Sequence, residues 1–229
     1  MSLDEKTEEL LTQIRKKCRD RGWFGADEWM DPGFSTLPPF RTTFPSVATE
    51  ERLEEVEHDL GFPLPPLLRD LYLHLANGEI GFGYGILPGE QLLQEYRSIC
   101  GGTCFDGAWH WPKFLIPLCY WVCTLYSYLD SEQGIILFAD TEGLFDGKGD
   151  FLVEAPSLLA WLDRWVTKQD QYPSLTQQGE GDGTDREELE DFDDEEDPQA
   201  RAMGLEKLED DPHTPIPPYV REYRRLSRL

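Results

Sequence analysis

The sequence lacks any long hydrophobic run. Its longest apolar stretch, around Phe114 to Val122, is too short to span a bilayer and is interrupted by Pro117. The opening residues, MSLDEKTEELL, are charged and lack the apolar centre of a secretory signal. We therefore expect a cytoplasmic protein with no membrane partner.

Basic residues are scarce. The chain has 45 Asp and Glu but only 21 Lys and Arg, which gives a formal net charge of −24. Residues 1–172 carry 28 acids and 14 bases, and residues 173–229 carry 17 acids and 7 bases, so the imbalance extends over the whole chain. A field of that sign repels nucleic acid and attracts basic proteins. The charge therefore indicates a basic protein partner or solubility alone, and no nucleic-acid partner.

Cysteine is infrequent and odd in number. Five cysteines in 229 residues fit a reducing compartment better than a disulfide framework. Four of them form a C-x3-C…C-x3-C array that suggests zinc: Cys100, Cys104, Cys119 and Cys123. If Cys119 and Cys123 share a strand, they stand about 13 Å apart, whereas zinc needs sulfurs within about 4 Å of each other. We therefore expect core cysteines and no metal site.

The sequence also lacks an assembled catalytic motif. The glycines at positions 81, 83 and 85 are not followed by the Lys-Ser/Thr pair of a phosphate loop, and no serine stands in a nucleophile elbow. Asp130 and Asp140 each end a predicted strand and could form a carboxylate pair, but Asp in a hairpin turn is the ordinary explanation. We predict no enzymatic activity and no cofactor.

The segment GFPLPPLLRDLYLHLANGEIGFGYG, from Gly61 to Gly85, is the most informative part of the chain. Its prolines and apolar spacing predict a helix over Pro65–Ala76, which Asn77-Gly78 ends. Alternating bulky residues and glycines then predict a strand over Ile80–Leu87 with one bare face. The helix face expected to pack on the sheet carries Leu68, Leu71 and Leu75.

This helix, Asn-Gly and Gly-rich unit resembles the start of the SMI1/KNR4 domain of the SUKH superfamily. The family's acidic first helix is similar to ATEERLEEVEHDLG (Ala48–Gly61), and its closing helix is similar to APSLLAWLDRWV (Ala155–Val166). Between them, WPKFLIPLCYWVCTLYSYLD (Trp111–Asp130) resembles a segment of a bacterial branch of the family. The four motifs occur in the family's order and spacing over residues 46–168.

For a bacterial member, the resemblance implies an immunity protein that binds and neutralises a cognate toxin of a polymorphic toxin system, for example a nuclease. The toxin domain would be the basic partner that the charge of the chain indicates. The alternative is a regulatory scaffold or adaptor that uses the domain together with its acidic tail, as eukaryotic relatives with flexible flanks suggest.

Our candidates for contact with the partner are Tyr84, Tyr120 and Trp121. Tyr84 lies beside the bare glycines. Tyr120 and Trp121 lie where this chain departs from the bacterial branch, which usually has an Asp and a Gly around the Trp. Sites of departure are places where specificity could reside, although Trp121 could equally be part of the core.

Three regions are expected. Residues 1–45 hold a helix over Asp4–Arg21 and an aromatic loop packed on the domain. Residues 46–172 form an α+β domain with an antiparallel β-sheet flanked by helices, in which the expected strands also include Leu115–Leu118, Trp121–Leu129, Gly134–Ala139 and a weaker one near Phe151–Val153. Residues 173–229 form an acidic tail, disordered at 179–197, whose basic C-terminus folds back onto the acidic run or docks on the domain.

Overall fold

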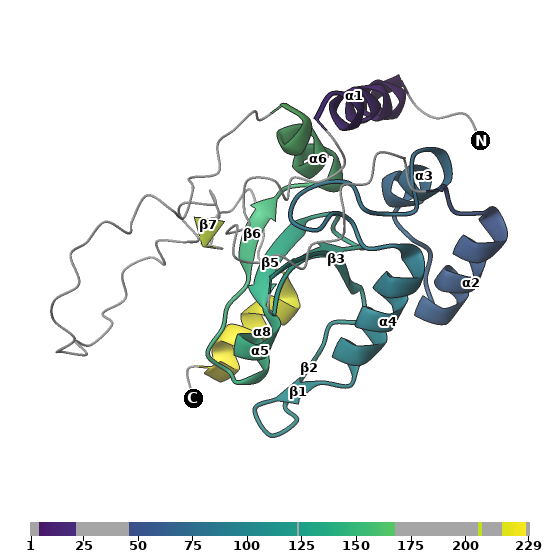
Figure 1. The fold of residues 1–229 in the computed structure, drawn as a ribbon. Coiled ribbons are helices and arrows are strands. Elements are labelled where there is room, and N and C mark those ends of the chain that lie inside the picture. The colour runs from purple at the N-terminus through teal and green to yellow at the C-terminus, as the bar shows by residue number, and fades with distance from the viewer. Residues whose placement is uncertain (1–4, 22–45, 123, 168–205, 208–216, 228–229) are drawn as a thin grey trace, which may run out of the picture.

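The helices and strands lie along the chain in the mixed order expected of an α+β fold (Figure 1). The computed structural model describes residues 5–21, 46–122, 124–167, 206–207 and 217–227. The helices are α1 (Glu5–Arg21), α2 (Glu50–Leu60), α3 (Pro66–His74), α4 (Gly89–Cys100), α5 (Thr141–Phe145), α6 (Leu158–Thr167) and α8 (Pro218–Ser227). The strands are β1 (Thr103–Cys104), β2 (Trp109–His110), β3 (Leu115–Val122), β4 (Leu125–Asp130), β5 (Ile136–Asp140), β6 (Leu152–Ala155) and β7 (Glu206–Lys207). The predicted aromatic loop and the acidic run 179–197 lie outside the described residues.

Five strands form one antiparallel sheet in the order β3-β4-β5-β6-β7, and β1 pairs with β2 in a separate hairpin. The expected α+β class is confirmed. The predicted strand over Trp121–Leu129 is wrong, because the chain turns between Val122 and Leu125, which pair at the end of the β3–β4 hairpin. Neither Gly nor Pro marks this turn, and β-branched and aromatic residues continue on both sides of it.

The strand predicted over Ile80–Leu87 is also wrong. Apart from a single bridge between Ile86 and Cys119, this segment is a compact loop. Its glycines have φ values of +113° at Gly81, +54° at Gly83 and +81° at Gly85, a region that other residues rarely adopt. The alternation of glycine with large residues has the period of a strand, but here it places a glycine at each position of a loop that requires a positive φ.

The sheet carries a hydrophobic core on each face, because successive side chains of a strand point to opposite sides. On β5, Ile136 and Phe138 belong to one core, while Leu137 and Ala139 belong to the other. We call the first the main core and the second the C-terminal core. The main core is shared with the buried faces of α1, α2, α3, α4 and α6, whereas the C-terminal core is shared with α8, α5 and the β1–β2 hairpin.

Local sequence signals place the helices of the main core. Thr49 caps α2 by accepting a hydrogen bond from the Arg52 amide, and Gly61 ends it with φ +79°. Ser157 caps α6 by accepting a hydrogen bond from the Ala160 amide at 3.1 Å. The apolar stripe of α1 is buried and consists of Leu10, Leu11, Ile14 and Cys18. Helix α1 packs on α6, and the Lys17 ammonium donates to the Trp165 carbonyl.

The predicted helix over Pro65–Ala76 forms as α3. Pro65 and Pro66 stand at its start, where a fixed φ and a missing N–H cost nothing. Its Leu68, Leu71 and Leu75 stripe is buried in the main core together with sheet residues, and the helix itself packs against α6.

The basic C-terminal end of the chain docks on the domain, which was one of the two arrangements expected. Helix α8 lies across the face of the sheet opposite α6 and close to α5 (Figure 1). Its Val220 and Tyr223 side chains are fully buried in the C-terminal core.

Candidate functional site

Two of the three predicted contact residues, Tyr84 and Tyr120, lie against each other. Their rings stack with centroids 5.2 Å apart and planes 29° apart, and the Tyr84 amide donates to the Tyr120 carbonyl at 3.0 Å. Tyr84 belongs to the Gly-rich loop, and Tyr120 belongs to β3, which is an edge strand of the sheet. Both side chains are half-buried. We call this pair the tyrosine pair.

The Gly-rich loop brings Tyr84 to this position because it covers part of the edge of β3. The amide of Leu87 donates to the Leu118 carbonyl at 2.8 Å, which satisfies an edge group that would otherwise face water. A Cβ atom on Gly83 would stand 2.7 Å from the Tyr120 carbonyl oxygen, so the loop can approach the strand this closely only with glycine there. Glycine therefore permits a close backbone approach here, made by a loop and not by the predicted strand.

The tyrosine pair continues inward as a row of aromatic rings. Tyr120 meets Tyr126 at 5.2 Å, Tyr126 meets Tyr128 at 5.9 Å, and Tyr128 meets Trp111 at 4.9 Å. Tyr126 donates its hydroxyl to Glu95 of α4 at 3.3 Å. Burial, followed by the negative charge of Glu95, raises the pKa of Tyr126 to about 12, so this phenol is neutral at physiological pH. The row connects the tyrosine pair to Tyr128 and Trp111, which are buried in the C-terminal core.

Trp121 lies beneath the surface and does not join the tyrosine pair. Its side chain is 8% exposed, it stacks on Phe82 at 6.0 Å, and its indole N–H donates to the Ser127 hydroxyl at 2.7 Å. Trp121 is a buried residue of the main core, whereas Tyr120 is only half-buried and packs against the outside of that core. This placement matches the alternative in which Trp121 belongs to the core.

A buried carboxylate lies next to Trp121, and the sequence analysis missed it. Glu154 of β6 is 4% exposed. It accepts hydrogen bonds from the Ser127 hydroxyl at 2.5 Å, the Trp161 indole at 2.6 Å and the Arg164 guanidinium at 3.2 Å. Burial raises the pKa of Glu154, although each of these three donors lowers it. The signal was a single acid inside the apolar strand sequence LVEA, ten residues before an arginine.

Arg164 binds the end of β6 and closes this network. One of its Nη atoms donates to the Glu154 carbonyl at 2.9 Å, and its guanidinium lies 5.1 Å above the Phe82 ring. The Glu154 network therefore joins β4, β6, α6 and the Gly-rich loop inside the main core. Its donors already satisfy both carboxylate oxygens, which is the arrangement of a structural ion pair.

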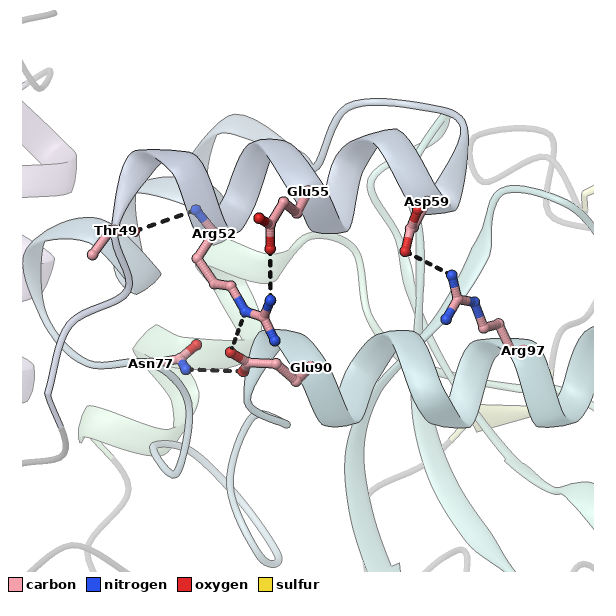
Figure 2. A network of polar contacts seen from close by, with 7 residues as sticks. All are labelled: Thr49, Arg52, Glu55, Asp59, Asn77, Glu90 and Arg97. Carbon is pink, nitrogen blue, oxygen red and sulfur yellow. Dashed lines mark hydrogen bonds and ion pairs between the residues drawn. The ribbon is translucent and has the colours of Figure 1, made fainter.

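The acidic surface of the domain is concentrated on α2. This helix of 11 residues contains six acids, and Figure 2 shows it lying beside α4. Arg52 pairs with Glu90 of α4 at 2.8 Å and with Glu55 at 2.6 Å, while Arg97 pairs with Asp59 at 2.7 Å. Arg69 of α3 pairs with Glu50 and with Glu57, so four of the six acids have an arginine partner. The helix itself still has six acids and one arginine and is net negative.

Asn77 connects this pair of helices to the Asn-Gly signature. Its side-chain oxygen accepts from the Gly89 amide at 3.1 Å at the start of α4. Its amide nitrogen donates to Glu90 at 3.3 Å, as Figure 2 shows. Gly78 follows with φ +88°. The Asn77 side chain thus links the segment that follows α3 to the first turn of α4.

The possible catalytic and metal groups do not come together in the described residues. Asp140 pairs with Leu125 at one end of β4, and Asp130 is at the other end, about 16 Å away at the rise of a strand. Asp130 accepts from the Glu132 and Gln133 amides, as predicted for a turn, whereas Asp140 caps α5.

The described cysteines do not assemble either. Within the described part of the chain, no three His, Cys, Asp or Glu side chains are grouped to hold a metal ion. Cys119 is buried in β3 and its thiol donates to the Phe82 carbonyl, while Cys100 is exposed at the end of α4. Cys123 lies outside the described residues. Burial raises the pKa of Cys119 well above its ordinary value, which keeps this thiol protonated.

The comparisons with known proteins agree with the motifs. The model of the SMI1 / KNR4 family (SUKH-1) matches residues 47–164, more than half of the chain. No curated protein matches the sequence. Across the described ranges, no helix has the length and apolar character needed to cross a membrane.

Proposed function

Because the chain belongs to the SMI1/KNR4 (SUKH-1) family, we propose that it is a non-enzymatic immunity protein that binds and neutralises a cognate toxin in the cytoplasm. The observation that carries the proposal is the tyrosine pair, Tyr84 and Tyr120, held at a sheet edge by glycines that position its backbone. Rigid, half-buried aromatic side chains are typical anchors of protein interfaces, since they bring contact area at little cost in conformational entropy.

Charge supports a basic partner such as a toxin domain. Residues 47–164 contain 19 acids and six bases, a net charge of −13. Such a field speeds encounter with a basic protein, while the desolvated aromatic anchors hold the complex together. Added salt should therefore slow association of the complex more than it changes dissociation.

The test uses the product of the adjacent gene as the partner. Y84A and Y120A should each weaken binding about tenfold or more, as loss of an interface anchor does. Leu159 is an exposed apolar residue on α6, and L159A serves as the control that should bind like the parent. Trp121 is a poor probe because W121A removes a buried core ring. If Y84A and Y120A stay folded and bind as tightly as the parent, the tyrosine pair is not the interface.

A second candidate function is a regulatory scaffold. The acid-rich run 179–197, with twelve acids and one base, lies outside the family match and favours an adaptor role. A neighbouring gene for a large multidomain toxin would support the immunity function. If no such gene is present and several unrelated proteins co-purify only when residues 173–229 are present, the scaffold function is supported.

A further inference from the structure

Helix α8 packs against aromatic residues on the sheet face opposite α6, and we call the surface that it covers the groove. Tyr223 is fully buried, and its ring meets Trp109 at 5.2 Å, Phe105 at 5.3 Å and Phe151 at 5.9 Å. All three contacts are edge-on, which is a favourable geometry for aromatic rings. Val220, three residues earlier on the same side of the helix, is also fully buried.

Polar contacts fix the direction and register of α8 in this groove. At its start, the Tyr219 hydroxyl donates to Asp130 at 2.7 Å, and the Trp109 indole donates to the Tyr219 carbonyl at 3.2 Å. Towards its end, Arg224 makes two contacts with the Asp150 carboxylate, at 2.9 and 2.8 Å. The 2.9 Å contact is a charge-assisted hydrogen bond from Nε, and the 2.8 Å contact is an ion pair from Nη2.

The groove and the helix come from different parts of the chain. The groove residues named above all lie between positions 105 and 151, inside the family match of residues 47–164. Helix α8 begins more than 50 residues after that match ends. The main core contains no residue of α8. Helix α8 has three arginines and one glutamate, and so its charge complements the acidic domain.

We propose that this groove is a helix-binding site and that α8 is its reversibly bound ligand in the same chain. The ligand class is a cationic amphipathic helix that carries tyrosines four residues apart and an arginine directly after the second. The ring of Tyr223 contacts Trp109, and the ring of Tyr219 contacts Phe151 while its hydroxyl donates to Asp130. The arginine, Arg224, pairs with Asp150. The proposal does not depend on the immunity function, because the groove contains neither Tyr84 nor Tyr120.

The experiment starts from the folded full-length chain. A specific protease site is introduced between residues 208 and 216, the protein is purified and cut, and the fragment that contains α8 is followed by size-exclusion chromatography and Trp fluorescence. The fragment should stay bound at high protein concentration and leave on dilution, while circular dichroism shows that the domain remains folded. Synthetic peptide 217–229 should then rebind and restore the fluorescence.

Peptide variants test the assigned contacts. The Y223A peptide should bind about 30-fold more weakly or worse, as expected when a buried aromatic anchor is removed. R225A, at an exposed position of the same helix, is the matched control and should bind within about threefold of the parent peptide. The proposal is overturned if the domain unfolds when the fragment leaves, or if the Y223A peptide binds as tightly as the R225A peptide. It is also overturned if the uncut protein is a dimer that exchanges α8 between copies.

Discussion

The main core and the C-terminal core lie on opposite faces of the same sheet, yet the chain builds them differently. The main core draws its helices from residues 5–21 and 50–167 and encloses the Glu154 network. The C-terminal core is covered by short elements and by α8, which follows the family segment at a distance. One face of the sheet is covered mainly by helices of the family segment, whereas the other is completed by a helix that lies beyond that segment.

The largest effect is expected from W161A in the main core. Trp161 is fully buried, packs edge-on against Phe82 and donates to Glu154, so its loss should cost about 3–5 kcal/mol of unfolding free energy. V220A, in the C-terminal core, removes two methyl groups from α8 and should cost about 1–2 kcal/mol or less. Urea unfolding curves of both variants measure the contrast. Equal losses would break the distinction between the cores.

A smaller effect is expected where the Gly-rich loop closes on the main core. In G81A the new Cβ would stand 2.7 Å from the Trp161 ring at a φ of +113°, so clash and strain together should cost about 2–4 kcal/mol. Gly134 has φ +76° with nothing within 4 Å of its Cβ position. G134A is therefore the matched control, with a loss of about 1 kcal/mol from strain alone. Thermal unfolding of the two variants tests whether the ring contact matters.

Four helices of the main core, α1, α2, α3 and α6, were predictable from sequence, because their signals are local. Each cap or first-turn residue acts within one turn of its own helix, as seen at Thr49, Gly61, Pro66 and Ser157. It failed at the Gly-rich loop, where glycine alternation imitates the period of a strand.

The candidate site was predictable only in part. Sequence could propose Tyr84 and Tyr120, but their stacking depends on a loop meeting an edge strand more than 30 residues away. Glu154 was missed because its donors, Ser127, Trp161 and Arg164, are brought together by the sheet and α6 and share no local pattern.

A pH-dependent effect sharpens the account of the main core. The raised pKa of Glu154 means that the folded protein holds this proton more tightly than the unfolded chain does. The stabilisation is therefore fully present below the ordinary pKa of 4.5 and is lost as pH rises through the folded pKa. Relative to E154Q, the parent should lose about 1.4 kcal/mol for each unit by which the folded pKa exceeds 4.5.

Unfolding curves of the parent and E154Q between pH 4 and pH 8 measure this difference. A parent that gains stability over E154Q as pH rises would show that Arg164 and the two other donors outweigh burial, and that the Glu154 pKa is lowered.

The most direct test of the central claim is native-state hydrogen exchange of the intact protein at increasing denaturant. The amides of α8 should exchange through a partial opening, faster and with a weaker denaturant dependence than those of β4 and α6. The amides of β4 and α6 should exchange only through global unfolding. Exchange of α8, β4 and α6 through one common opening, with the same free energy and denaturant dependence, would contradict the central claim.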